Sequence, residues 1–311
     1  MLSRYHAAID PDEENNSHAA MLRMVGFNKL VLEAGCASGH VSERLSAQGC
    51  SVVGIEIESE IVAPAMQWLE RAVIGNIEDH ALWDELDGLR FDAILFGDVL
   101  EHLKEPLEVL REAAKHLAPS GTVVISAPNI AHADVKIALI NGTFPYSENG
   151  LLDRTHIHFF TKESLITLVR EAGMAVVEIS RVTVPVFQTE LGVGRGDIDE
   201  RTLEAILRDR ESETYQFVVK AVLDNAEHSI EDLSYKLVEL TDLLLDETKR
   251  FASLKAEYEA LLARVSELEA QREENLRDLA RLREQREAIK RVLPGPLRRF
   301  VKGKLGITGR D

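Results

Sequence analysis

Two different hydrophobic periods divide this chain. Between residues 29 and 223, short apolar runs bounded by turn residues alternate with segments in which apolar positions recur every three or four residues. The apolar runs predict buried strands, and the segments between them predict helices. From residue 233 onward the apolar positions repeat as a heptad instead. The pattern therefore predicts an α/β domain followed by a long helix of another kind.

The first part is predicted to be a doubly wound parallel sheet covered by helices on both faces. The expected strands are 29–35, 51–57, 71–75, 91–97, 121–127, 174–186 and 215–223, and the expected helices are 40–48, 59–69, 106–117 and 162–172. The connection 129–160, helical near 133–140, is long enough to be a lid or an acceptor-binding loop. An acidic segment, 188–214, precedes the last strand.

The segment before the first strand, residues 1–28, is predicted to be an N-terminal cap. Its polar group 15–18 precedes a stretch of helical character. This segment either closes over a ligand or is a capped helix that starts at Ser17, and the sequence favours neither.

The heptad region is predicted to be a coiled-coil seam. Fourteen of 18 seam positions are apolar, and 61 residues of helix span roughly 90 Å. A lone helix cannot bury such a stripe, so the simplest partner is a second copy of the chain; a solvated single helix is the alternative. The seam positions are Leu233, Leu237, Leu240, Leu244, Glu247, Phe251, Leu254, Tyr258, Leu261, Val265, Leu268, Arg272, Asn275, Leu279, Leu282, Arg286, Ile289 and Leu293.

The end of the chain changes character again. Residues 288–310 contain no acid, and their basic residues are interleaved with apolar ones. Such a basic amphipathic tail suits an anionic membrane surface or an acidic partner, and a disordered basic tail is the alternative. The predicted domains are therefore an N-terminal cap (1–28), an α/β domain (29–224), a coiled coil (225–293) and a basic tail (294–311).

Composition limits the class of protein. The 311 residues are 45% hydrophobic and 29% charged, with a net charge of −17, so a sizeable core is expected and general affinity for nucleic acid is not. No apolar run is long enough to span a membrane, and no secretory signal pattern opens the chain. Two cysteines, Cys36 and Cys50, are too few for a disulfide framework and favour a cytoplasmic protein, with the basic tail allowing a peripheral place at the inner face of the membrane.

Candidate chemistry begins where the first predicted strand ends in a turn of small residues. Glu33 is followed at every second position by Gly35, Ala37 and Gly39. Small side chains let backbone N–H groups approach a ligand closely. His40 stands where a dinucleotide fingerprint needs its third glycine, which argues against a nicotinamide dehydrogenase. A carboxylate before the turn suits a cationic ligand and would repel a pyrophosphate.

The second predicted strand also ends in an acid. Glu56 lies 21 positions after Gly35, where a carboxylate can accept both hydroxyls of a ribose. The turn, Glu33 and Glu56 together resemble the first motifs of class I S-adenosylmethionine-dependent methyltransferases. An ordinary βαβ unit without a cofactor is the alternative.

The resemblance covers about residues 12–223. It includes Asn-Asn-Ser-His at 15–18, Leu-Glu-His at 100–102 and Arg-Thr-His-Ile-His-Phe-Phe-Thr at 154–161. Many bacterial methyltransferases with these motifs look like surface-polysaccharide or glycan enzymes, some with a C-terminal coiled coil. The resemblance implies a seven-stranded Rossmann-like sheet in which the last strand is antiparallel and lies beside the fifth.

The same resemblance implies a site for S-adenosyl-L-methionine. Glu33 and the glycines would hold the methionine end, Glu56 the ribose, and Asn76 with Ile77 the adenine, although Gly75-Asn76 is also plain turn chemistry. Ala37, Asn76 and the two glutamates depart from the commoner glycine and aspartates of the family. The implied cofactor residues are Glu33, Gly35, Cys36, Ala37, Gly39, Glu56, Ile57, Asn76, Ile77, Gly97 and Asp98.

The exit of the fourth predicted strand carries acids and a histidine where ligands of an open α/β sheet bind. His102 or His156 is the expected base that removes the proton of a hydroxyl acceptor. In a further hypothesis Asp98, Glu101, His102 and His156 hold a divalent metal such as Mg²⁺, a layout that resembles the metal sites of ubiquinone-pathway and small-RNA O-methyltransferases. Alternatively, Glu101 and His102 merely cap and orient the turn.

The resulting functional hypothesis is an S-adenosylmethionine-dependent O-methyltransferase that acts on a glycan or a related hydroxyl or phosphate acceptor in cell-surface polysaccharide synthesis. The competing hypothesis is a non-catalytic scaffold in which the coiled coil assembles a methyltransferase-like head. The cofactor motifs favour the enzyme, because a scaffold needs neither Glu33 nor Glu56.

Overall fold

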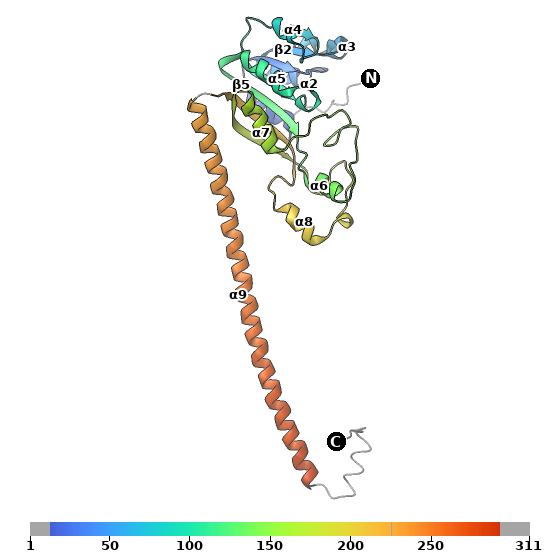
Figure 1. The fold of residues 1–311 in the computed structure, drawn as a ribbon, viewed down its shortest axis with the longest axis vertical. Helices are drawn as coiled ribbons and strands as arrows, with labels where there is room; N and C mark the ends of the chain where they lie inside the picture. Colours follow the sequence, from blue (N-terminus) through green and yellow to red (C-terminus); the bar gives the residue numbers. More distant parts are fainter. Residues whose placement is uncertain (1–12, 225, 293–311) are drawn as a thin grey trace. The chain divides into compact units, whose positions relative to one another are not determined.

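The computed structural model describes residues 13–224 and 226–292, and it divides the chain into two compact units, Met1–Lys236 and Leu237–Asp311. The first unit contains one seven-stranded sheet (Figure 1). Its strands are β1 (Leu30–Ala34), β2 (Ser51–Glu56), β3 (Arg71–Ile74), β4 (Phe91–Gly97), β5 (Leu117–Pro128), β6 (Met174–Thr183) and β7 (Thr214–Leu223).

The helices connect these strands. The α-helices are α1 (Ser17–Val25), α2 (His40–Ala47), α3 (Ser59–Val62), α4 (His80–Asp84), α5 (Pro106–Lys115), α6 (Ala133–Ile140), α7 (Lys162–Glu171) and α8 (Glu200–Leu207), followed by the long α9 (Ala226–Val292). Three short 3₁₀ turns complete the described part, η1 (Ala63–Gln67), η2 (Leu100–His102) and η3 (Arg195–Asp197).

The order of strands in the sheet is β3-β2-β1-β4-β5-β7-β6. Strands β1 to β5 pair in parallel, and β7 lies antiparallel between β5 and β6. This confirms the predicted Rossmann-like fold, including the antiparallel last strand beside the fifth. The direction of winding reverses between β1 and β4, so a ligand crevice is expected at the carboxyl ends of these strands.

Apolar side chains of the sheet pack against helices on both faces. Helices α1 and α2 cover one face, where Met21, Leu45, Val31 and Leu95 belong to one buried cluster. Helices α4, α5 and α7 contribute Leu82, Leu110 and Val169 to the larger cluster of the other face. Both faces of the central strands are therefore excluded from water, which explains the nearly continuous apolar runs of these strands.

The sequence prediction was wrong for one helix and missed another. The expected helix 59–69 is α3 followed by η1, because Pro64 near the start of η1 lacks the N–H that a continuous α-helix needs. The acidic segment 188–214 contains α8, whose N-cap Asp199 accepts from Thr202 N–H, a cap that the sequence analysis overlooked.

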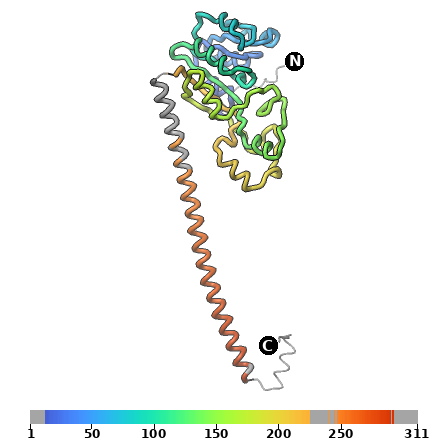
Figure 2. Tube along the Cα trace, in the orientation of Figure 1, coloured from blue at the N-terminus to red at the C-terminus, as the bar shows by residue number. Residues whose placement is uncertain are grey.

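Helices α6 and α8 contact each other beside the sheet, in the green and yellow parts of Figure 2. Buried Asp134 of α6 holds the chain that leads to α8, since its carboxylate accepts from Phe187 N–H at 2.8 Å and from the Thr189 hydroxyl at 2.6 Å. Asn141 donates to Asp197 O at 2.8 Å. The predicted long connection after β5 is thus ordered by the acidic segment.

The second unit consists of most of α9. Its side chains are described from Leu240 onward with a few gaps, and the apolar ones at seam positions are 46–73% exposed. No helix in the described part of the chain is long and apolar enough to cross a membrane. Residues 1–12 of the predicted cap and the predicted tail 294–311 lie outside the described residues.

Candidate functional site

The turn after β1 has a backbone that favours glycine. Gly35 has φ +65° and Gly39 has φ +86°. A Cβ at Gly35 would lie 2.9 Å from Val99 Cγ2, and one at Gly39 would lie 2.6 Å from Ala65 Cβ. Ala37 has φ +45°, so the residue that departs from the family's glycine occupies the left-handed region at some energetic cost.

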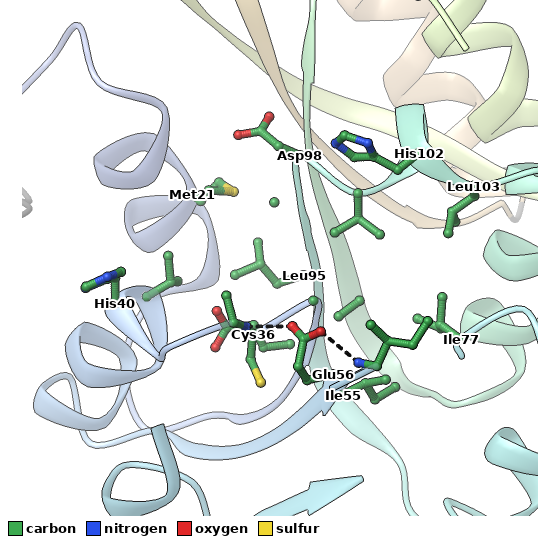
Figure 3. A pocket seen from close by; sticks show the side chains of 18 of the residues that line it. Met21, Cys36, His40, Ile55, Glu56, Ile77, Leu95, Asp98, His102 and Leu103 are labelled. Carbon is green, nitrogen blue, oxygen red and sulfur yellow. Dashed lines mark hydrogen bonds between the residues drawn. The ribbon is translucent and has the colours of Figure 1, made fainter. Parts of the chain in front are cut away.

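The carboxylate of Glu56 holds the turn in place. One oxygen accepts from Ala37 N–H at 3.0 Å, and the other accepts from Ile57 N–H at 2.7 Å (Figure 3). These bonds join the carboxyl ends of β1 and β2. They use one lone pair of each oxygen, so the half-buried carboxylate can still accept from a ligand's hydroxyls.

Glu33, at the carboxyl end of β1, is only 5% exposed. Its carboxylate accepts a short hydrogen bond from the Ser42 hydroxyl of α2. Burial raises the pKa of Glu33 to about 7, although the Ser42 bond works in the opposite direction. A buried carboxylate with a single hydrogen bond favours a cationic group next to it, because the cation offsets its desolvation.

A pocket of about 660 Å³ opens over the carboxyl ends of β1, β2 and β4. Every predicted cofactor residue except Gly39 lines it, as does His102; Gly39 acts through the shape of the turn instead. Met21, Val99 and Leu103 also line the pocket, although no sequence motif marks them as ligand-binding residues. Figure 3 shows Met21 of α1 and Leu103 bordering the same space.

The N-terminal segment contains the capped helix that starts at Ser17, and two of its residues lie at the pocket. Asn16 is the N-cap of α1, and its side chain accepts from Ala19 N–H at 3.1 Å. Asn16 and His18 also line the pocket. Asn15 fixes the segment to the end of β6, since it donates to Thr183 O at 2.9 Å and accepts from Thr183 N–H at 2.7 Å.

The turn after β3 borders the other end of the pocket. Asn76 accepts from Glu78 N–H at 3.0 Å, as expected of a plain turn. Ile77 is buried, and its carbonyl accepts from Trp83 Nε1 at 2.9 Å. Both Asn76 and Ile77 line the pocket, and their contact with a ligand stays a prediction. Cys36 is buried as well, and burial raises the pKa of its thiol.

Asp98, just after β4, has φ +54°. Its Oδ1 accepts from the Ser126 hydroxyl of β5 at 2.8 Å and from the Gln216 amide of β7. The inserted strand β7 therefore helps to aim Asp98, which the sequence could not reveal. Asp98 lines the pocket but does not belong to the group of clustered metal-ligating side chains described next, so its predicted role as a metal ligand is not seen in this geometry.

Glu101, His102 and His156 form a cluster at the edge of the pocket. Their potential ligand atoms all lie within 4.8 Å of one another. The Glu101 carbonyl accepts from the N–H groups of Ile157 and His158 at 2.9 and 3.0 Å, which holds the chain around His156 over η2. Two segments that are more than 50 residues apart in the sequence thus meet at the exit of β4, where the predicted bases lie.

Burial shifts the pKa values of Glu101 and His156, the two more buried members of this cluster. Burial, and then the nearby Asp98, raise the pKa of Glu101 well above its usual value. Burial, and then His102, lower the pKa of His156. The Nδ1–H of His102 donates to Thr155 O at 3.2 Å, which leaves Nε2 of the neutral ring as an acceptor.

The cluster fits a divalent cation by its own chemistry. Glu101 is 1% exposed, and neither carboxylate oxygen has a hydrogen-bond partner within the described part of the chain. A carboxyl group in this place is either paired with a cation or protonated. One carboxylate and two imidazoles suit a borderline ion such as Mn²⁺, Fe²⁺ or Zn²⁺ better than the Mg²⁺ expected from the sequence, because imidazole is a poor ligand for Mg²⁺.

A row of aromatic rings leads outward from this cluster. Ring centroids are 4.8 Å apart for His102 and His156, 6.3 Å for His156 and Phe159, 5.8 Å for Phe159 and Phe144, and 5.0 Å for Phe144 and Tyr146. Phe159 and Phe144 are each 36% exposed and Tyr146 is 51% exposed. We name His156, Phe159, Phe144 and Tyr146 the aromatic row. His158 points elsewhere, toward Lys104 O at 3.2 Å.

Comparison with known proteins gives a family. Residues 17–179, more than half of the chain, match the model of the family described as Methyltransferase domain. Two curated relatives are named ubiquinone biosynthesis O-methyltransferase. The chain is 27% identical to that of Hydrogenovibrio crunogenus over 157 residues (49% of this chain, 64% of the relative) and 30% identical to that of Xanthomonas campestris pv. campestris over 158 residues (48% and 64%). The chain therefore spans less than two thirds of these relatives.

Solved structures are more distant. A SAM-dependent methyltransferase from Archaeoglobus fulgidus is 19% identical with a TM-score of 0.48, covering 66% of this chain and 91% of that one. A 1,6-didemethyltoxoflavin-N1-methyltransferase from Burkholderia thailandensis is 21% identical with a TM-score of 0.44, covering 69% and 80%.

Proposed function

Because this chain belongs to the methyltransferase domain family, we propose that it transfers a methyl group from S-adenosyl-L-methionine to a hydroxyl oxygen. The observation that carries the proposal is the pair of carboxylates, Glu33 and Glu56, on either side of the turn after β1 in a pocket of about 660 Å³. A cofactor that carries a positive charge and a ribose matches both acids.

Each part of the cofactor has a matching group in the pocket. The ammonium of the methionine end would lie near Glu33, where its charge offsets the burial of the carboxylate. The ribose hydroxyls would donate to Glu56. The adenine would lie between the exposed Ile57 and the buried Ile77, with Asn76 at its edge.

Transfer is a direct displacement at the methyl carbon. The acceptor oxygen forms a bond to that carbon while the carbon–sulfur bond breaks, and the acceptor's proton leaves to a base. His102 lines the pocket, and the ring of His156 lies next to it, so either imidazole is placed to accept the proton. Holding acceptor and methyl carbon in line supplies much of the rate.

We also propose that Glu101, His102 and His156 hold a divalent cation. Such a cation supplies a Lewis acid that lowers the pKa of a coordinated hydroxyl. With a cation bound, the two histidines would serve as its ligands and not as bases. The proton of the acceptor would then pass to solvent or to another group of the pocket. The unpartnered carboxylate of Glu101 supports this proposal.

The acceptor is proposed to be a glycan hydroxyl or a related phosphate used in cell-surface polysaccharide synthesis. The motifs at 15–18, 100–102 and 154–161 support it through their resemblance to glycan-associated enzymes. The names of the two curated relatives favour a phenolic hydroxyl instead. Both acceptors present an oxygen nucleophile, and the aromatic row beside His156 would contact the rest of either molecule.

The test is calorimetric titration of the full chain with S-adenosylhomocysteine, followed by methyl transfer from labelled cofactor to sugar and catechol acceptors. Micromolar binding and label in a sugar product support the whole proposal. Label only in a catechol corrects the acceptor and keeps the enzyme. Absence of binding by the folded protein overturns the enzyme and favours the non-catalytic scaffold.

A further inference from the structure

Helix α9 presents an apolar seam that its own unit does not cover. The seam side chains described between Leu240 and Ile289 are 46–73% exposed. An exposed apolar stripe along an entire helix marks an interaction surface, and a heptad spacing fits another helix of the same spacing. A second copy of this chain is the partner whose seam has a matching period.

Charged seam residues distinguish between the two ways of pairing copies. Glu247, Arg272 and Arg286 occupy seam positions. In a parallel dimer in register, each of them would face its own counterpart, so like charges would meet in three layers. Like charges in the seam destabilise that arrangement, and proteins use such residues to set strand direction and register.

An antiparallel pair avoids these contacts. The seam alternates steps of four and three residues, and the same alternation holds when the helix is read in the opposite direction. The seam residues of an antiparallel copy can therefore lie level with those of the first helix. Placing Tyr258 opposite the partner's Leu261 aligns every described seam residue between 240 and 279 with a seam residue of the partner. The aligned pairs are Leu240 with Leu279, Leu244 with Asn275, Glu247 with Arg272, Phe251 with Leu268, Leu254 with Val265 and Tyr258 with Leu261.

We propose that α9 pairs with α9 of a second copy in antiparallel orientation, with Glu247 of each chain opposite Arg272 of the other. The two-fold symmetry makes both opposite-charge pairs at once. Shifting the register by one heptad step would place Glu247 opposite Leu279 and Arg272 opposite Leu254, so neither residue would face an opposite charge in the partner's seam. The cost of the proposed register is Asn275 opposite Leu244. The proposal does not depend on the methyl transfer proposed above.

Disulfide trapping tests the orientation in the full-length protein. Leu254→Cys and Val265→Cys are made as separate variants, mixed and oxidised, with the natural chain as control for Cys36 and Cys50. The expected product is a disulfide-linked dimer in the mixture and none in either variant alone. In the proposed register two copies of Cys at 254 are offset by 11 residues, about 16 Å along the helix, which is too far for a disulfide. Self-linked dimers of Leu254→Cys alone would overturn the proposal.

Charge exchange tests the register. Glu247→Arg and Arg272→Glu should each weaken dimerisation at least tenfold in sedimentation equilibrium. In either variant, residues 247 and 272 would carry the same charge and would face each other across the seam. The double variant should restore the dissociation constant to within a few-fold of the natural value. In a parallel dimer the double variant would keep like charges in both layers, so failure of rescue overturns the register. A monomeric natural chain, or a trimer or tetramer, overturns the dimer itself.

Discussion

Nε2 of His156 lies 4.0 Å from Oε1 of Glu101, although 55 residues separate them in the sequence. Both side chains are almost completely buried. The backbone of Ile157 and His158, bonded to the Glu101 carbonyl, fixes this approach. The pair joins the exit of β4 to the loop after α6, and it stands where the cofactor pocket meets the aromatic row.

This pair leads to a prediction about metal removal. Excess chelator should lower methyl transfer at least tenfold, and Mn²⁺ should restore it, because the cation lowers the pKa of the acceptor hydroxyl. Mn²⁺ should also raise the melting temperature of the natural chain but not of Glu101→Gln, which keeps the size of the side chain and removes its charge.

Glu105→Gln, an exposed acid four residues later in the chain, is the matched control and should behave like the natural protein. If the chelator changes neither activity nor melting temperature, Glu101 and His102 only orient the turn, as the alternative from the sequence analysis holds.

A second prediction concerns the ribose. Glu56→Gln should weaken binding of S-adenosylhomocysteine at least tenfold, since a neutral amide is a weaker acceptor for the two hydroxyls than a carboxylate, and bonds to charged groups contribute about 1.5–3 kcal/mol. Calorimetric titration measures the change. Glu58→Gln, two residues further on and exposed, should bind as the natural chain does; equal affinity of both variants would remove Glu56 from the cofactor site.

The parts of the site that lie at strand ends could be predicted from sequence. Glu33 and Glu56 terminate two apolar runs, and parallel strands bring their carboxyl ends to one edge, so periodicity alone placed both acids together. The resemblance added His156, which no spacing rule links to Glu101. The same resemblance identified the Asn-Asn-Ser-His segment, and Asn16 and His18 do line the pocket.

Other features depended on contacts that local sequence does not reveal. Asp98 was predicted to hold a metal, yet its carboxylate bonds Ser126 and Gln216 because β7 inserts between β5 and β6. Helix α8 was missed because acidic residues dominate its segment and only Leu203 of its side chains is buried. Contacts between segments far apart in the sequence therefore determine both the orientation of Asp98 and the position of α8.

A third prediction concerns the aromatic row. Tyr146→Ala should raise KM for the acceptor several-fold with little change in kcat. Tyr146 is the last ring of the row, and two other rings separate it from His156. Loss of one such contact with a bound molecule costs about 1 kcal/mol. Phe27→Ala, an exposed aromatic outside the row, should leave KM unchanged. An equal KM for both variants would show that the acceptor does not touch this surface.

The last prediction concerns pH and Glu33. The folded pKa of Glu33 is raised from 4.5 to about 7, so the folded protein binds a proton more tightly than the unfolded chain does. Its contribution to stability is therefore fully present below pH 4.5 and is lost as the pH rises through 7, a change on the order of 3 kcal/mol. Melting temperatures of the free protein, measured relative to Glu33→Gln, should fall across this window.

Cofactor binding should have the opposite dependence, because the ammonium group binds the ionised carboxylate. The affinity for S-adenosylhomocysteine should rise as the pH increases from 6 to 8, and calorimetry in buffers of different ionisation enthalpy should detect release of a proton near pH 6. Glu33→Gln removes the titrating group while keeping its shape, so its affinity should be weaker and less dependent on pH. An unchanged pH profile in Glu33→Gln would assign the titration to another group of the pocket, and would place the ammonium away from Glu33.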